Sequence, residues 1–141
     1  MKAPAVTERT FATALLAAAA LAAVAAAILF RHVDPNAPGN PLPACVFYTV
    51  THLYCAGCGI TRALHALAHG DVLRALHMNP LAVFMLAAGP LMLLHVRGWR
   101  PDALQPVMRV LLSGTFWLVL LPTYMVLRNL PWWPFTLLAP G

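Results

Sequence analysis

The residues best suited to chemistry are the three cysteines, Cys45, Cys55 and Cys58, of which the last two enclose only Ala56 and Gly57. A Cys-x-x-Cys pair followed by glycine is typical of a metal-binding turn, because glycine lets the backbone fold beneath the two sulfur atoms. Structural zinc takes four ligands. Three thiolates would therefore need one more ligand, for which the neighbouring candidates are His52, His65 and His69.

The same cysteines allow two other interpretations, which the sequence leaves open. A thiol near the start of a helix, with Arg62 close by, can have a lowered pKa and exchange disulfides. Alternatively, a structural disulfide joins Cys45 to Cys55 or Cys58, as occurs in oxidising compartments. An odd number of cysteines is consistent with one disulfide and a free thiol, or with a three-thiolate metal site.

A polar helix face follows the cysteine pair. A helix over residues 62–69 would place Arg62, His65 and His69 on one side and leucines on the other. Because guanidinium pairs well with phosphate, this face is a candidate contact for a lipid phosphate or another anion. The alternative is that it is simply the wet face of a helix lying on a membrane.

No motif for a known reaction accompanies these residues. The four acidic residues, Glu8, Asp34, Asp71 and Asp102, are scattered, so they form no carboxylate pair for hydrolysis. Neither a serine nucleophile motif nor a phosphate-binding loop occurs. The sequence therefore favours a non-enzymatic protein.

Composition indicates a membrane protein. The chain is 61% hydrophobic and only 9% charged, against about 45–50% and 25% in soluble domains. Its mean hydropathy is +0.75. The net charge of +5 is placed at the ends of apolar runs rather than in a basic cluster, so it favours contact with lipid headgroups and argues against nucleic acid as a partner.

Apolar runs at residues 10–30, 80–96 and 106–127 have about the length that a helix needs to cross a bilayer. A cleaved signal peptide is the alternative for the first run, which is long for one. Residues 31–61 read as a proline-rich linker and the cysteine loop, and residues 128–141 as an interfacial tail. We expect an all-α integral membrane protein with three transmembrane helices.

Two short amphipathic helices are expected within residues 62–77, lying in the headgroup region after the cysteine loop. Thr61 is the predicted cap of the first, and Asp71 that of the second. Gly70 separates them. Asn79 followed by Pro80 is a strong signal for the start of the second crossing.

Topology follows from the basic residues. With three crossings, Lys2, Arg9, Arg97, Arg100 and Arg109 share one side, and Arg31, Arg62, Arg74 and Arg128 the other. The positive-inside rule then favours a cytoplasmic N-terminus and an extracytoplasmic cysteine loop in the cytoplasmic (inner) membrane of a bacterium. Three helices bury little surface in one protomer, so self-association or a larger membrane partner is expected.

The stretch Cys55-Ala-Gly-Cys-Gly-Ile-Thr-Arg, with Cys45 before it and Gly70-Asp71 and Asn79-Pro80 after it, resembles the signature of a family of small bacterial membrane proteins of unknown function. The family pattern reads C-P-G-C-G-x-T-R, and the resemblance covers about residues 43–95. Ala56 stands where the family has proline. The resemblance implies that Gly57, Gly59, Thr61, Arg62, Asp71, Asn79 and Pro80 are motif positions, but it implies no reaction.

The leading hypothesis is a small membrane protein whose cysteine loop is a structural platform, held by a disulfide or a metal, for a partner protein or lipid. The alternative is a membrane protein for thiol-disulfide exchange or metal handling. No cofactor is certain from the sequence, and zinc is the one that it suggests.

Overall fold

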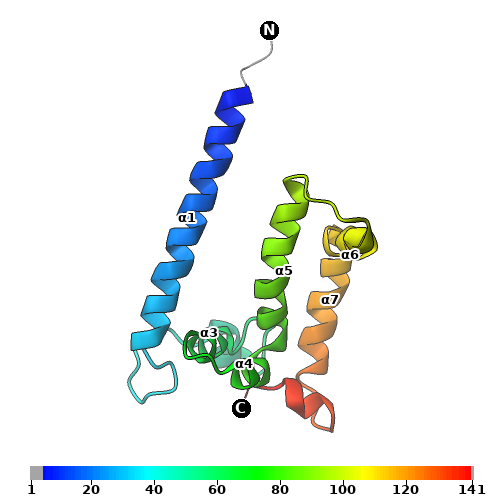
Figure 1. Cartoon of the computed structure of the whole chain (residues 1–141). Coiled ribbons are helices and arrows are strands. Elements are labelled where there is room, and N and C mark those ends of the chain that lie inside the picture. The colour runs from blue at the N-terminus through cyan, green and yellow to red at the C-terminus, as the bar shows by residue number, and fades with distance from the viewer. Residues whose placement is uncertain (1–4, 141) are drawn as a thin grey trace.

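The structure is a computed structural model that describes residues 5–140, with side chains for residues 13, 14 and 16–140. It is all-helical in this part of the chain, as predicted, and Figure 1 shows the arrangement. Lys2 and the side chains of Glu8 and Arg9 lie outside the described part. The elements are α1 (Ala5–His32), α2 (Val46–Thr51), α3 (Ile60–Ala68), α4 (Val72–Met78), α5 (Pro80–Val96), the 3-10 helix η1 (Asp102–Leu104), α6 (Gln105–Leu111), α7 (Gly114–Leu127) and the 3-10 helix η2 (Phe135–Leu138).

Two short helices form a base from which three longer ones rise. In Figure 1, α3 and α4 lie across the foot of the molecule, with α5 and α7 above them on one side and α1 on the other. Helix α1 contacts α3 near its C-terminal end. The cysteine loop, which directly precedes α3, therefore lies at the end of the molecule where all three long helices meet the base.

Alanine makes the base compact. Ala63 and Ala66 of α3 and Ala75 of α4 are buried together, and their small side chains let the two helices approach closely. Gly70 adopts the left-handed conformation between the helices (φ +79°). The Asp71 carboxylate accepts a hydrogen bond from the Arg74 amide at 2.9 Å, which confirms the predicted cap of α4.

Asn79 and Pro80 begin α5 as the sequence predicts. The Asn79 side-chain oxygen accepts a hydrogen bond from the Ala82 amide at 2.9 Å, and Pro80 occupies the first turn. The predicted range 80–96 coincides with the observed helix.

The helix predicted over residues 106–127 is instead two helices, α6 and α7. Ser113, at the break, has an extended backbone (φ −78°, ψ 122°), and Ser113, Gly114 and Thr115 are weaker helix formers than leucine. The Trp117 indole donates a hydrogen bond to the Leu111 carbonyl at 2.7 Å, replacing the amide partner that a continuous helix would supply. These small residues thus permit a bend.

The bends bear on how the chain relates to a membrane. Within the described residues, no single helix is both long and apolar enough to cross one. Two bent pairs meet those criteria only when each pair is taken together: α4 with α5, which meet at 116°, and η1 and α6 with α7, which meet at 62°. Residues Leu16–His32 of α1 form a shorter apolar helix.

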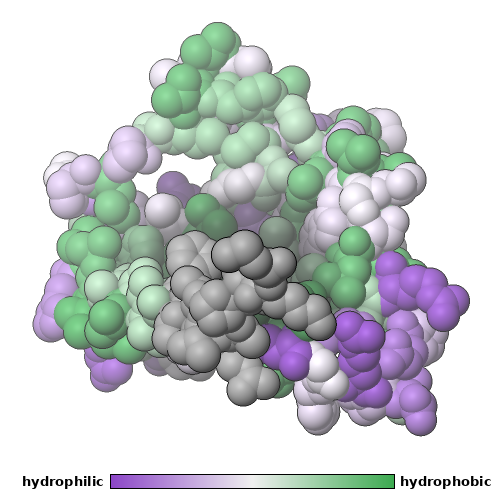
Figure 2. All heavy atoms as spheres, turned by 90° about the horizontal axis from the view of Figure 1, so that it is seen from above, coloured by the Kyte–Doolittle hydropathy of each residue, from purple (hydrophilic) through white to green (hydrophobic). Residues whose placement is uncertain are grey.

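Large apolar side chains face outward on all three long helices. Leu21 of α1 is 71% exposed and Leu118 of α7 is 76% exposed, and half of the Leu86 side chain on α5 is exposed. Figure 2, a view from above, shows hydrophobic side chains over much of the visible periphery, with hydrophilic residues gathered at a few places along its edge. The described part of the chain buries two small clusters, the alanines of the base and a second group formed by Ala88, Met108 and Leu111, and leaves most of its leucine and valine uncovered.

Candidate metal centre

The three cysteine sulfur atoms converge on one point. The Sγ atoms of Cys55 and Cys58 are 3.1 Å apart, those of Cys45 and Cys58 are 3.3 Å apart, and those of Cys45 and Cys55 are 3.5 Å apart. These distances exceed the roughly 2.05 Å of a disulfide bond, and all three cysteines are free. The cysteine before α2 and the two of the turn before α3 thus present their sulfur atoms as one group.

This triangle fits a single tetrahedral metal ion. Sulfur atoms about 2.3 Å from zinc lie about 3.8 Å from one another, a few tenths of an ångström more than the distances seen here. The sulfur atoms are too close together to ligate different irons of an iron–sulfur cluster. Among the histidine, cysteine and acidic side chains that the structure describes, the group contains Cys45, Cys55 and Cys58 and no fourth member.

The turn between Cys55 and Cys58 is held by its own backbone. The Cys55 amide donates to the Cys58 sulfur at 3.1 Å, and the Cys58 amide donates to the Cys55 carbonyl at 3.1 Å. Gly59 follows in the left-handed conformation (φ +83°), and a Cβ atom there would lie 2.6 Å from the Met78 carbonyl oxygen. Glycine is therefore required at this position both by its backbone conformation and by the close approach of Met78, the last residue of α4.

The predicted cap at Thr61 is wrong. Helix α3 begins at Ile60 with Gly59 as its N-cap residue, and no side chain caps it. The turn continues directly into the helix, because the Ile60 amide donates to the Gly57 carbonyl and the Ala63 amide to the Gly59 carbonyl. Thr61 therefore lies inside the first turn of α3, where it lines a cleft beside the cysteine group.

Cys45 reaches the group from α2, a helix that the sequence analysis assigned to the linker and loop. Cys45 is the N-cap residue of α2, and the Tyr48 amide is the main group that lowers the pKa of the Cys45 thiol. By contrast, burial raises the pKa of the Cys58 thiol to about 12, with further contributions from the other two thiols. The centre therefore combines one thiol with a lowered pKa and one with a strongly raised pKa.

Arg128 supports the loop from below, although the sequence analysis counted it only as a topology charge. It is 1% exposed at the end of α7. Its Nη1 atom donates to the carbonyl oxygens of Cys55 at 2.8 Å and Ala56 at 3.3 Å, and Nη2 donates to that of Cys58 at 3.1 Å. One guanidinium group thus binds the carbonyls of both cysteines of the pair.

The charge of Arg128 has no acidic partner in the described part of the chain, where the ion pair is that of His65 with Asp34. Its Nε atom has no hydrogen-bond partner, and the Tyr54 and Tyr124 rings lie 5.8 and 5.0 Å from its central carbon. A buried cation without a counter-charge is costly.

Two asparagines also hold the backbone of the cysteine loop and of the residue before it through hydrogen bonds. The Asn79 amide nitrogen donates to the carbonyls of Ala56 at 2.9 Å and Cys58 at 3.1 Å, while its oxygen caps α5. Asn129 binds the Tyr54 backbone in both directions, accepting from the amide and donating to the carbonyl at 2.8 Å. The motif position Asn79 thus connects the loop to α5. Sequence reasoning missed the role of Asn129, since an asparagine after a helix gives no signal of a contact so far along the chain.

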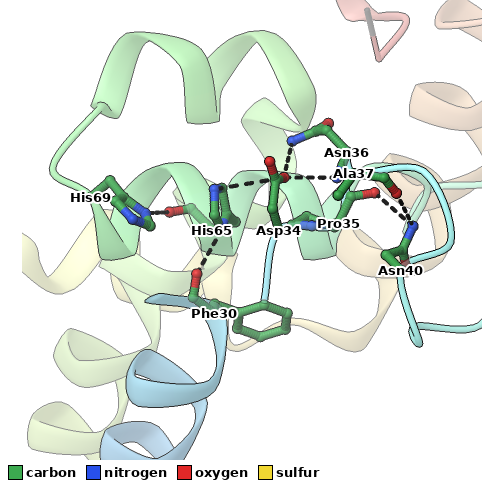
Figure 3. Close-up of polar contacts among 8 residues, drawn as sticks. All are labelled: Phe30, Asp34, Pro35, Asn36, Ala37, Asn40, His65 and His69. Atoms are coloured by element: carbon green, nitrogen blue, oxygen red, sulfur yellow. Dashed lines mark hydrogen bonds and ion pairs between the residues drawn. The ribbon is translucent and has the colours of Figure 1, made fainter. Parts of the chain in front are cut away.

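The histidines proposed as a fourth ligand make other contacts. Figure 3 shows His65 of α3 reaching the end of α1, where its Nδ1 donates to the Phe30 carbonyl at 2.6 Å and its Nε2 lies 3.8 Å from the Asp34 carboxylate. His69 Nδ1 contacts the His65 carbonyl at 2.9 Å. His52 ends α2 in the left-handed conformation. His65 therefore joins α1 to the base.

A cleft of about 510 Å³ adjoins the cysteine group, and both Cys45 and Cys58 line it. Arg62 and Thr61 contribute from the first turn of α3. The Tyr48 and Tyr54 rings, which also line the cleft, are stacked with centroids 4.9 Å apart. The cysteine centre is therefore open on one side and held by hydrogen bonds on the other.

No curated protein and no solved structure matches this chain. One family model matches a segment of the chain that contains the three cysteines and Asn79, whereas Arg128 and Asn129 follow this segment. The segment, residues 45–93, matches the model of a family described as a protein of unknown function (DUF2752), in agreement with the resemblance found in the sequence.

Proposed function

We propose that this chain is a small integral membrane protein that binds one zinc ion through Cys45, Cys55 and Cys58. The ion makes the cysteine loop a rigid platform at the membrane surface for a partner. The observation that carries the proposal is the triangle of sulfur atoms with sides of 3.1 to 3.5 Å. Thiolates from the start of α2 and from the turn before α3, so placed, can all bind one thiophilic cation.

The positive charge of Arg128 beneath the cysteine loop favours a bound metal with three thiolates over three neutral thiols. Zinc with three thiolates carries one negative charge, and Arg128 beneath the loop carries one positive charge. Arg128 is buried and donates three hydrogen bonds to loop carbonyls, so its charge is fixed close to the centre. A metal-bound centre therefore supplies the counter-charge that a buried guanidinium needs.

Membrane insertion is supported by the outward-facing apolar side chains of α1, α5 and α7. In water this exposure would be unfavourable, whereas lipid accommodates it. The sharp bend between α4 and α5 allows α5 to cross the bilayer while α4 lies along its surface. On this arrangement, three crossings place the cysteine centre at one headgroup layer, which we assign to the extracytoplasmic side of a bacterial inner membrane.

Thiol-disulfide exchange is the second candidate, because the pKa of Cys45 is lowered whereas that of Cys58 is raised to about 12. In exchange, the Cys45 thiolate attacks a substrate disulfide, forming a mixed disulfide and expelling one substrate thiolate. A second thiolate of the centre then attacks the Cys45 sulfur, forming a disulfide within the centre and releasing the other substrate thiolate, so the substrate is reduced as the centre is oxidised. The close sulfur contacts would then serve disulfide formation within the centre.

Native mass spectrometry of the protein purified in mild detergent tests the proposal. We expect one zinc ion per chain, lost in each of Cys45→Ser, Cys55→Ser and Cys58→Ser, because an incomplete site forfeits most of its binding energy. His69→Ala is the matched control and should retain zinc, since His69 contacts its own helix. Zinc binding that survives all three cysteine substitutions would contradict the proposal.

Alkylation separates the two candidates. If zinc holds the thiols, a chelator should allow iodoacetamide to modify them without any reductant, Cys45 before Cys58. If the centre works by exchange, reductant should expose two thiols and the chelator none.

A further inference from the structure

The open side of the cysteine centre faces a cleft of a size suited to a small molecule. Its volume of about 510 Å³ falls within the usual range of ligand sites. Cys45 comes from the start of α2 and Cys58 from the turn before α3, and both belong to its wall. A metal ion held by the three sulfur atoms would therefore be accessible from this cleft.

We propose that the cleft binds a small organic carboxylate, one oxygen of which supplies the fourth ligand of the metal while the other pairs with Arg62. This inference rests on the proposed zinc centre. The described histidine, cysteine and acidic side chains provide three ligands and no fourth. Zinc sites with three protein ligands bind an exogenous molecule in the remaining position.

The charge of the residues around the cleft favours an anionic ligand. Among the described residues that line the cleft, Arg62 carries the one full charge, and none is acidic. Zinc, three thiolates and the guanidinium groups of Arg62 and Arg128 together carry one positive charge. A monocarboxylate neutralises it, and its two oxygens can contact a metal and a guanidinium at the same time.

The rest of the cleft suits an apolar body. The stacked Tyr48 and Tyr54 rings offer a flat surface, and Leu42 and Pro43 of the linker lie on the cleft as well. A tyrosine hydroxyl is neutral at pH 7, so this wall is uncharged. Aromatic and aliphatic carboxylates therefore fit better than a strongly hydrated anion such as inorganic phosphate.

Cobalt substitution provides the test, with benzoate as probe and benzamide as its uncharged counterpart. Cobalt(II) on three thiolates gives a thiolate-to-metal charge-transfer band, and its visible ligand-field bands respond to the fourth ligand. We expect benzoate to change the ligand-field bands saturably and benzamide to leave them unchanged. Arg62→Gln should weaken benzoate binding about tenfold or more, the usual effect of losing a hydrogen bond to a charged group. Arg74→Gln, which removes an exposed arginine outside the cleft, should not.

The charge-transfer band separates the failure of this inference from that of the zinc centre. If the band never forms, both are overturned. If the band forms but benzoate changes nothing, or acts equally in Arg62→Gln, the carboxylate site alone is overturned. Should Arg62→Gln lose the band through misfolding, Arg62→Lys replaces it. Lysine keeps the charge but loses the two-point contact, so intermediate affinity is expected, and affinity equal to that of the parent would contradict the role of Arg62.

Discussion

Arg128 donates a hydrogen bond to the carbonyl oxygen of Cys55 at 2.8 Å, so the last turn of α7 supports a cysteine that lies 73 residues earlier in the chain. The same guanidinium also binds the Cys58 carbonyl. Because these bonds fix the loop backbone and bring positive charge beneath the thiols, Arg128 couples the third long helix to the cysteine group.

We expect Arg128→Gln to lower zinc affinity about tenfold or more, since glutamine loses both the charge and several donated bonds. Competition with a chromophoric chelator measures this. Arg109→Gln is the control, because Arg109 is an exposed arginine of α6. Equal affinity in parent and Arg128→Gln would show that the buried charge plays no part in metal binding.

Asn79 has two separable roles, which two substitutions distinguish. Asn79→Asp keeps the oxygen that caps α5 but loses the donors to Ala56 and Cys58, whereas Asn79→Ala loses both. We expect Asn79→Ala to lower the free energy of unfolding by about 2–4 kcal/mol, from the lost cap and the unpaired loop carbonyls. Asn79→Asp should reduce zinc affinity as well, because it places a carboxylate under the loop carbonyls. Thermal unfolding in detergent, with and without zinc, gives both quantities, and variants as stable as the parent would refute this account of the loop.

Gly59 is constrained by space as well as by conformation. Gly59→Ala would place a Cβ atom 2.6 Å from the Met78 carbonyl oxygen, whereas Gly70→Ala meets nothing within 4 Å at a similar φ. Both substitutions cost about 1 kcal/mol for the left-handed backbone, so the larger loss expected for Gly59→Ala measures the clash. Matched melting curves of the two variants provide the comparison. Equal losses would mean that α4 does not approach the loop so closely.

The difference in pKa between the cysteines predicts an order of modification in metal-free, reduced protein. A lowered pKa gives Cys45 more thiolate at any given pH, and a pKa of about 12 keeps Cys58 protonated throughout the neutral range. Iodoacetamide at pH 7 should therefore modify Cys45 before Cys58, and the rate at Cys45 should level off at a lower pH as the pH is raised. Peptide mapping at timed intervals measures this, and faster modification of Cys58 would contradict the proposed asymmetry.

We expect copies of the chain to associate through α7, with Gly114 at the contact. A Cβ atom at Gly114 would meet nothing within 4 Å in the protomer, so Gly114→Leu should fold normally. If copies pack closely along α7, the added side chain should weaken the oligomer by blocking that contact. Size-exclusion chromatography with light scattering in mild detergent measures the mass, with Gly39→Ala as a control in the linker, where the space is also open. An unchanged mass would argue against this contact.

Local signals were readable from the sequence, and long-range contacts were not. The Asp71 cap and the Asn79-Pro80 start of α5 depend on neighbouring residues, and the structure confirms both. Helix α2 escaped prediction because six residues with two aromatics and two threonines give no clear helical period. The break at Ser113 was hidden because hydrophobicity continues across it.

The contacts that hold the cysteine loop could not be predicted from the sequence either, because they too join distant parts of the chain. A basic residue at the end of an apolar helix is normally a membrane-surface charge, so nothing adjacent to Arg128 indicated that it is buried under a loop formed by residues 55–58. The three sulfur atoms likewise converge only because the linker places Cys45 beside the turn that contains Cys55 and Cys58. Spacing alone indicated a metal turn at Cys55 and Cys58 but left the place of Cys45 open.

X-ray absorption at the zinc edge of the purified protein tests the central claim most directly. The account predicts a first shell of three sulfur atoms at about 2.3 Å and one lighter ligand at about 2.0–2.2 Å. Cys45→Ser should remove one of the sulfur atoms or abolish the signal. A first shell of nitrogen and oxygen without sulfur, or protein that contains no zinc after growth in its presence, would contradict the metal centre.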